Sequence, residues 1–536
     1  MQSDNNRRLF LGCFIGLAAT SFGFAVRGAV LGDWETQFGL TEEQKGIING
    51  VGVYPFAISI ILFSLIVDRI GYGTAMVFAF LGHVVSTVLT IFAPNFLTLY
   101  LATFLYALSN GVVESVINPV VATIYKDNKT HWLNVLHAGW PGGLVLGGLL
   151  SILVTRLEDG FGAKLPGEIW QWQMAILLLP ILVYGSLLRG VRFPTQERVE
   201  AGVSFDDMLK EFGWGSAYIV SYLIIMGICQ VLTVLDMESV RSLLAWLDWR
   251  TAMIVAVVPA MLFAVRVRGA FGRPMFVFLL LLMFLLATTE LGTDGWIQDI
   301  MGAVLQDKTM GTWFIVYTSA IMFVLRFFAG PIVHRISPLG LLAASSALAV
   351  IGLVWLGNAG TGGGVLFLAA TLYGFGKTFF WPTTLGVVSE QYPKGGALLL
   401  NAVTGVGMIA VGTIGGPYIG TIQDADFNRA VSEQAPELHK SVAATKTGLF
   451  SQYEYVDKSN YDALDKAERE RLAGWERSTK QQALAKIAVL PAIMLACYVG
   501  LIAYFRAKGG YKAEVLTGHA AIDEKFTGGT IGPGEG

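Results

Sequence analysis

Four charged side chains stand inside long apolar stretches of the 536-residue chain: Arg27, Glu114, Glu290 and Lys377. A charge at the centre of a bilayer costs at least about 2.5–3.5 kcal/mol on insertion scales, so such residues usually face the inside of a helix bundle and have a function. Two interpretations fit them. They form charge pairs that rearrange during a transport cycle, or they form static ion pairs that only fix helix packing.

Polar residues that could contact a solute or a proton accompany these charges. Asn118 lies four residues after Glu114, on the same helical face, where it can bond a solute hydroxyl or cap the backbone freed by Pro119. His137 also stands in an apolar stretch. An imidazole titrates near neutral pH, so His137 is either a proton relay or solute contact, or a hydrogen-bonded interior histidine.

Two tryptophans and one further carboxylate complete the candidates for a solute site. Trp140 and Trp381 each stand beside a proline. Aromatic faces cover the apolar C–H faces of sugar rings, although many membrane tryptophans only pack or anchor at the interface. Asp294 lies one helical turn beyond Glu290, where it is either a solute contact or part of a solvated helix end.

The composition indicates the elements that must position these residues. Hydrophobic residues make up 54% of the chain and charged residues only 14%, which points to lipid as the solvent. A spanning helix needs roughly 20 apolar residues. We predict an all-α integral membrane protein with about fourteen transmembrane helices, over residues 9–31, 45–67, 73–93, 96–125, 132–155, 169–189, 215–235, 249–268, 273–293, 310–333, 338–357, 364–390, 396–421 and 484–506.

The basic residues between these stretches predict an orientation. With the N-terminus inside, the connections that carry Arg69, Arg192, Arg266 and Arg335 all face the cytoplasm. The positive-inside rule therefore predicts a multi-pass protein of the cell (inner) membrane with both termini cytoplasmic. The highly charged segment 422–482 is predicted to be a helical extracytoplasmic insertion.

Short motifs recur in the same order at an offset of about 265 residues, the internal symmetry on which many transporters are built. The matched pairs are VDRI at 67–70 with VHRI at 333–336, Gly111 and Pro119 with Gly374 and Pro382, and LN at 133–134 with LN at 400–401. We predict an N-terminal six-helix half at 1–190, an inserted linker with two transmembrane helices at 191–270, the first five helices of the C-terminal half at 271–421, the insertion at 422–482, the last transmembrane helix at 483–510 and a cytoplasmic tail at 511–536.

Three motifs resemble a known family. VDRIGYG at 67–73 resembles the D-R-x-G motif of the major facilitator superfamily. ESVINP at 114–119 and LRFFAGPIVHRISP at 325–338 are similar to the helix 4 signature and the turn after helix 8 of the fucose:proton symporter family. The resemblance implies the major facilitator fold, with two six-helix halves, and sugar uptake driven by protons. It also indicates gating roles for Asp68, Arg69, Arg326 and Arg335.

The chain departs from this family at the expected site. Gly28, beside Arg27, stands where the family has a helix 1 carboxylate, and His137 and Trp140 replace a glutamine and an asparagine of helix 5. In the superfamily, helices 1, 4, 7 and 10 line the central cavity. The resemblance therefore implies charge pairs between Arg27 and Glu114 and between Glu290 and Lys377. We expect Glu114 to carry the proton, with Glu290 as the second candidate.

The leading hypothesis is a secondary active transporter that takes up a sugar or similar small polar solute with protons or sodium by alternating access. One alternative is an antiporter or exporter of an anionic or amphipathic solute, with Arg27 and Lys377 as ligands. Another is a transporter-like nutrient sensor. The sequence contains no metal-ligand cluster, nucleophile motif or phosphate-binding loop in context, so we expect neither an enzyme nor a cofactor. We expect a monomer whose partners are solute, ion and lipid, without nucleic acid.

Overall fold

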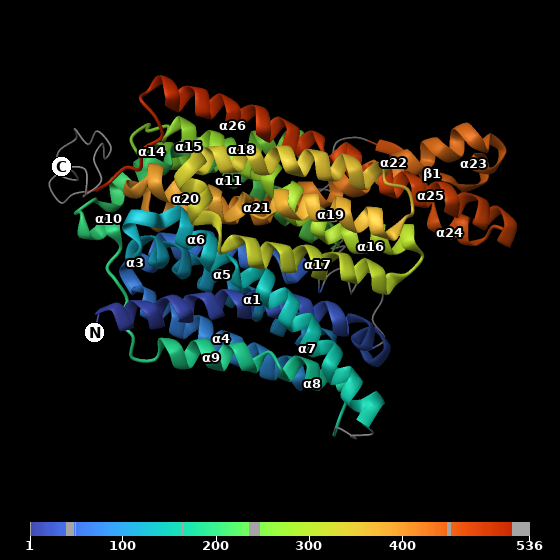
Figure 1. The fold of residues 1–536 in the computed structure, drawn as a ribbon, viewed down its shortest axis with the longest axis horizontal. Helices are drawn as coiled ribbons and strands as arrows, with labels where there is room; N and C mark the ends of the chain where they lie inside the picture. The colour runs from blue at the N-terminus through green and yellow to red at the C-terminus, as the bar shows by residue number, and fades with distance from the viewer. Residues whose placement is uncertain are drawn as a thin grey trace.

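The apolar stretches fold as helices, because a bilayer offers no partner to exposed backbone amides. The computed structural model describes residues 2–38, 48, 50–161, 166–234, 247–447 and 452–516. The long helices run side by side along one axis (Figure 1). α1 begins and α26 ends at the same end of this bundle, here called the terminal end, and the opposite, insertion end carries α22–α25.

The described residues of the first half of the chain are mostly helical. Their helices are α1 (Gln2–Phe38), α3 (Tyr54–Ile70), α4 (Tyr72–Ile91), α5 (Phe96–Ile124), η1 (Lys126–Asn128), α6 (Lys129–His137), α7 (Gly139–Phe161), α8 (Ile169–Ala175) and α9 (Leu178–Leu188). Gly71 makes the tight turn between α3 and α4 with φ of 82°, a value that glycine adopts without steric cost.

A linker region follows and packs against the second half of the chain. It comprises α10 (Glu197–Glu200), α11 (Phe205–Val234), α13 (Trp249–Val255) and α14 (Val257–Arg266). α11 packs against α14, α15 and α21. The apolar pair therefore lies beside helices of the second half.

The second half repeats the helical plan with more interruptions. Its helices are α15 (Pro274–Ala287), η3 (Thr288–Gly292), α16 (Thr293–Leu305), α17 (Lys308–Arg326), α18 (Ala329–Asn358), α19 (Gly363–Lys377), α20 (Phe380–Gln391), η4 (Pro393–Gly395), α21 (Gly396–Ala410), η5 (Val411–Gly415), α22 (Gly416–Gln434) and α26 (Val489–Ala507). α18 contains a sharp kink at Ser337, just before Pro338, so two of the predicted spans meet inside it.

The expected spans all have helical counterparts. Among the described residues, twelve helices are long and apolar enough to cross a membrane, and the shorter apolar helices Tyr54–Val67 and Trp313–Arg326 stand where two further spans were predicted. The fold class predicted from composition is therefore confirmed. Parts of the predictions fall outside the described residues, namely 45–47 and 49 of the second span, residue 235 of the seventh, and 517–536 of the tail.

The charged segment 422–482 forms a small folded unit at the insertion end. It contains the end of α22, α23 (Pro436–Val442), α24 (Lys458–Asp462), most of α25 (Lys466–Ile487) and a two-stranded antiparallel sheet of β1 (Ala443–Thr447) and β2 (Gln452–Val456). The sequence predicted helices alone, and the alternating Tyr453 and Tyr455 of β2 were the missed strand signal. Val431, Val442 and Leu472 form its core.

Candidate functional site

A cavity lies between helices from both halves of the chain. Its wall combines charged, polar and aromatic side chains, the mixed lining expected of a small-molecule site. Five of the predicted site residues line it together: Glu114, His137, Trp140, Glu290 and Trp381. The rest of the wall is formed by Phe56, Leu291, Arg326, Thr404 and Met408.

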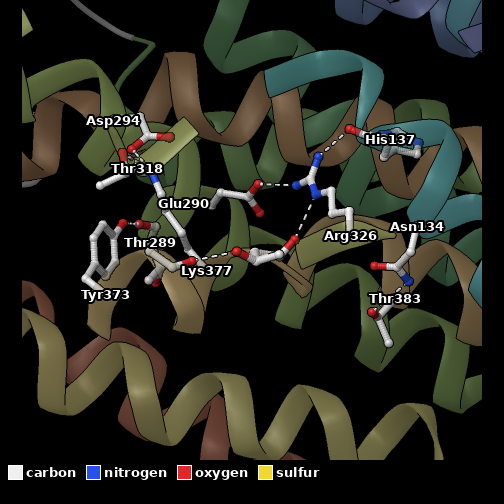
Figure 2. A network of polar contacts seen from close by, with 12 residues as sticks. Asn134, His137, Thr289, Glu290, Asp294, Thr318, Arg326, Tyr373, Lys377 and Thr383 are labelled. Carbon is white, nitrogen blue, oxygen red and sulfur yellow. Dashed lines mark hydrogen bonds and ion pairs between the residues drawn. The ribbon is translucent and has the colours of Figure 1, made fainter. Parts of the chain in front are cut away.

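Glu290 forms a buried ion pair with Arg326, as Figure 2 shows. Arg326 Nη2 lies 3.1 Å from Glu290 Oε1, and both side chains are almost fully buried. Glu290 stands in η3, a turn of π-helix of the kind that often marks functional positions in longer helices. Its other oxygen, Oε2, is buried and accepts no hydrogen bond from the described residues.

Arg326 connects the two halves of the chain. Besides Glu290, its guanidinium donates to the carbonyl of Thr378 through Nε (2.8 Å) and to the carbonyl of His137 through Nη1 (2.5 Å). His137 ends α6, in the first half. Arg326 was expected to act in gating, but it lies at the cavity. It ends α17, and only Phe327 and Phe328 separate it from α18, which continues to the kink at Ser337.

Lys377 forms an ion pair with Asp294 instead of the expected pair with Glu290. Its ammonium also donates to Thr318 Oγ1 (3.2 Å) and lies 5.3 Å from the ring centroid of Tyr373. The predicted pairing was wrong because Arg326 already occupies Glu290, which leaves Asp294, one turn further along the helix, for Lys377 (Figure 2).

Arg27 and Glu114 do not form the expected pair. Arg27 is buried, with its guanidinium 4.7 Å from the ring centroid of Phe24. It also lies against Gly52, where an added Cβ would stand 2.3 Å from Nη2, so the missing side chain makes room for it. Within the described part of the chain, no carboxylate forms an ion pair with Arg27.

Glu114 is bonded within its own helix. Asn118 Nδ2 donates to Glu114 Oε2 at 2.8 Å, and His137 Nε2 donates to Asn118 Oδ1 at 2.9 Å. These three predicted residues therefore form one chain of hydrogen bonds beside the cavity. Asn118 neutralises no charge, so Glu114 is a buried carboxyl group without a cation paired to it among the described residues.

Aromatic rings cover both sides of the cavity. Trp140 is stacked on Phe56 with an interplanar angle of 22° and lies 5.7 Å from Phe24. From the second half of the chain, Trp381 also lines the cavity and packs over Gly407, where an added Cβ would lie 2.8 Å from the indole. The two tryptophans thus provide apolar faces from different halves of the chain.

Between the cavity and the terminal end, two asparagines at corresponding positions of the repeat form hydrogen bonds from one half to the other. Asn134 Nδ2 donates to Thr383 Oγ1 (3.1 Å), and Asn401 Nδ2 donates to the carbonyl of Ser115 (2.8 Å). Asn134 and Asn401 are the asparagines of the two LN motifs. The repeat marker found in the sequence is therefore also a contact between the halves.

Further contacts at this end were missed in the sequence. Thr130 donates to Glu390 Oε1 through both N (3.2 Å) and Oγ1 (2.5 Å), and Lys129 Nζ donates to the carbonyl of Ser389 (3.2 Å). Lys129 also pairs with Glu197 of the linker at 2.7 Å. In the sequence these residues resemble ordinary loop charges, because each stands at the edge of an apolar stretch.

The remaining predicted gating residues lie away from the cavity. Arg69 is exposed, with its guanidinium 4.8 Å from the ring centroid of Phe205, and Arg335 is exposed near the kink of α18. The side chain of Asp68 lies outside the described part of the structure. Their gating roles remain predictions. Nowhere in the described ranges do three or more His, Cys, Asp or Glu side chains gather as a metal site would require.

Comparison with protein families decides the classification. The family model described as Major Facilitator Superfamily matches residues 13–419, about three quarters of the chain. The chain belongs to the Major Facilitator Superfamily. The recognition of this superfamily from VDRIGYG and the repeat is thereby confirmed, and the mostly helical membrane fold is that of its transporters.

Solved structures of this superfamily share the fold at low sequence identity. The E. coli fucose:proton symporter is 12% identical with a TM-score of 0.55, and the alignment covers 92% of this chain and 98% of that one. The proton:xylose symporter XylE is 12% identical with a TM-score of 0.57, covering 93% and 97%. The human organic anion transporter MFSD10 is 15% identical with a TM-score of 0.56, covering 91% and 99%.

One curated relative matches part of the sequence. The gentisate transporter of Corynebacterium glutamicum is 23% identical over 163 residues, which are 30% of this chain. The match spans 35% of that relative, about a third of its length.

Proposed function

We propose that this superfamily member is a secondary active transporter that takes up a small ring-bearing solute together with protons by alternating access. The observation that carries the proposal is the cavity between the halves, in which Glu114 stands without a paired cation among the described residues while aromatic faces line both sides. A buried carboxylate without a counterion is costly, so Glu114 favours the protonated form until water or a cation reaches it.

The proton exchange follows from this preference. In the state open to the outside, Glu114 takes a proton from external water, and solute enters the cavity. After the cavity opens to the cytoplasm, water hydrates the carboxyl group, and the proton leaves to the cytoplasmic side with the solute. The network through Asn118 to His137 links Glu114 to α6, which contacts the other half, so the proton and the helix arrangement influence one another.

The contacts at the terminal end supply the gate. By the positive-inside rule this end faces the cytoplasm. The bonds from Asn134, Asn401, Thr130 and Lys129 to the other half must break before solute can leave there. Each such bond contributes roughly 0.5–1.5 kcal/mol, so several together hold this end closed while still allowing it to open.

Two classes of solute present a ring to the aromatic walls. The fucose and xylose symporters that share the fold carry sugars. Sugar rings stack on tryptophan, and His137 on the cavity wall provides a polar group for their hydroxyls. The curated relative carries gentisate by its name. For this class the favouring observation is the buried cation Arg27 beside the aromatic wall.

Uptake by proteoliposomes tests the proposal. The purified protein is reconstituted with an alkaline interior, and labelled xylose, fucose and gentisate are supplied outside. We expect accumulation of at least one of them above its equilibrium level, and loss of accumulation when a protonophore collapses the gradient. Accumulation that ignores the protonophore would contradict proton coupling, and no uptake of any of them would contradict the proposed solute range.

A further inference from the structure

Arg27 occupies the layer next to the aromatic wall, toward the insertion end. On α1 it lies one turn beyond Phe24, and the residue it touches, Gly52, lies just before α3 and four residues before Phe56. The ring centroids of Phe24 and Phe56 are 6.3 Å apart, and both rings contact that of Trp140. The guanidinium therefore lies between α1 and the residues that precede α3, on the ring of Phe24, which contacts the other two rings.

The cation lacks the partners that the other buried cations near the cavity have. Arg326 has a carboxylate and two carbonyls, and Lys377 has Asp294 and Thr318. Arg27 is 6% exposed. Among the described residues, the guanidinium has a cation–π contact with the ring of Phe24 but no ion pair with a carboxylate. A ring face replaces only part of the hydration that a buried cation loses, so an anion in this place would be strongly favoured.

The geometry defines the anion that fits. A guanidinium presents parallel N–H groups that match a planar carboxylate, and Arg is preferred over Lys where such two-point recognition occurs. A ring attached to that carboxylate would extend toward Phe24, Phe56 and Trp140, whose faces and edges favour aromatic partners. Carboxylate and ring would thus be held by adjacent layers of the first half of the chain.

We propose that Arg27 binds the carboxylate of an aromatic acid, which the transporter carries with its ring against Phe24, Phe56 and Trp140. This proposal rests on the proposed transport function and specifies its solute. The name of the curated relative agrees with it, since gentisate is an aromatic acid. Gly52 is part of the site, because any larger residue there would displace the guanidinium.

Binding to the purified protein in detergent tests the proposal, with gentisate and its neutral amide, 2,5-dihydroxybenzamide, as probes. We expect wild-type protein to bind gentisate at least 10-fold more tightly than the amide. Arg27→Gln should lose that preference, and Arg27→Lys should keep part of it. Arg250→Gln is the matched control, because Arg250 also lies over a ring, that of Trp249 at 5.1 Å, but is exposed. It should bind gentisate like the wild type.

Gly52→Ala provides a second route if Arg27→Gln fails to fold, since it displaces the guanidinium while keeping the charge. It should weaken gentisate binding at least 10-fold. Equal binding of acid and amide by the wild type, or unchanged gentisate binding in either variant, would overturn the proposal. The transport function is tested separately. Accumulation of xylose without any binding of gentisate would refute the proposal of an aromatic acid as solute, while proton-coupled transport would still hold.

Discussion

In the second half of the chain, the charges around the cavity are neutralised by neighbours from the same half, whereas in the first half they are not. Glu290 has Arg326, and Lys377 has Asp294. Arg27 rests on a phenylalanine ring, and Glu114 on an asparagine amide, with no opposite charge paired to either among the described residues. The offset that separates Gly111 from Gly374 also separates Arg27 from Glu290 and Glu114 from Lys377. Corresponding positions of the two halves therefore differ in how their charges are paired.

This difference indicates that the two halves have different roles in transport. A wall whose charges are already paired keeps its structure through the cycle, because breaking a pair would leave a buried charge. In the first half, Arg27 and Glu114 have no partner of opposite charge among the described residues. A solute anion can pair with Arg27, and a proton can neutralise Glu114. On this account the first half binds the transported species, and the second half provides a fixed surface against which it moves.

The largest effect on stability is expected at Arg326. Arg326→Gln leaves Glu290 buried without its cation and removes bonds to Thr378 and His137, so unfolding should become easier by about 3–5 kcal/mol. Thermal denaturation in detergent measures this, and adding Glu290→Gln should recover part of the loss. A melting temperature equal to that of the wild type would contradict the claim that the paired charges stabilise the second half.

A smaller loss is expected at Lys377. Asp294 is 15% exposed and can gain water when its partner is lost, so Lys377→Met should cost only about 1–3 kcal/mol. The same denaturation assay applies, with Asp294→Asn added to Lys377→Met as the matched double variant. If Lys377→Met destabilised the protein more than Arg326→Gln, the order of the two pairs would be wrong.

Asn134 and Asn401 should give equal and modest effects, because they make the same kind of contact between the halves from both directions. Asn134→Ala and Asn401→Ala should each weaken the closed terminal end by about 0.5–1.5 kcal/mol. Faster hydrogen exchange in α6 and α21 would report this opening. An effect in only one variant would show that the repeat does not extend to this gate.

The smallest effect on stability is expected in the first half. Glu114→Gln replaces a buried acid with a neutral group that can still accept the bond from Asn118, so the free energy of unfolding should stay within about 1 kcal/mol of the wild type or increase. Denaturation of Glu114→Gln and Glu290→Gln side by side sharpens the comparison. Equal destabilisation of both would mean that the halves do not differ.

The sequence predicted the helices, the superfamily and half of the residues of the cavity, because each rests on a pattern along the chain. Apolar length places the spans, and a charge within a span places Glu114 and Glu290 in the interior. Asn118, four residues after Glu114, could be assigned to its face for the same reason.

Pairing could not be predicted in this way, since it depends on contacts between distant helices. Arg326 was assigned to a gate because its motif resembles a turn, and only the packing of the end of α17 against η3 places it beside Glu290. Without that cation, Lys377 was the obvious partner for Glu290. The bonds of Thr130 to Glu390 depend likewise on how the halves meet, with 260 residues between the partners.

Solute-driven proton movement tests the central claim most directly. Proteoliposomes that contain a pH-sensitive dye receive, from outside, whichever of xylose, fucose and gentisate the wild type accumulates. We predict that solute acidifies the interior with wild-type protein and with Glu437→Gln, an exposed control in the insertion. With Glu114→Gln the acidification should be absent, while exchange of labelled for unlabelled solute continues. Acidification by Glu114→Gln at the wild-type rate would contradict the account.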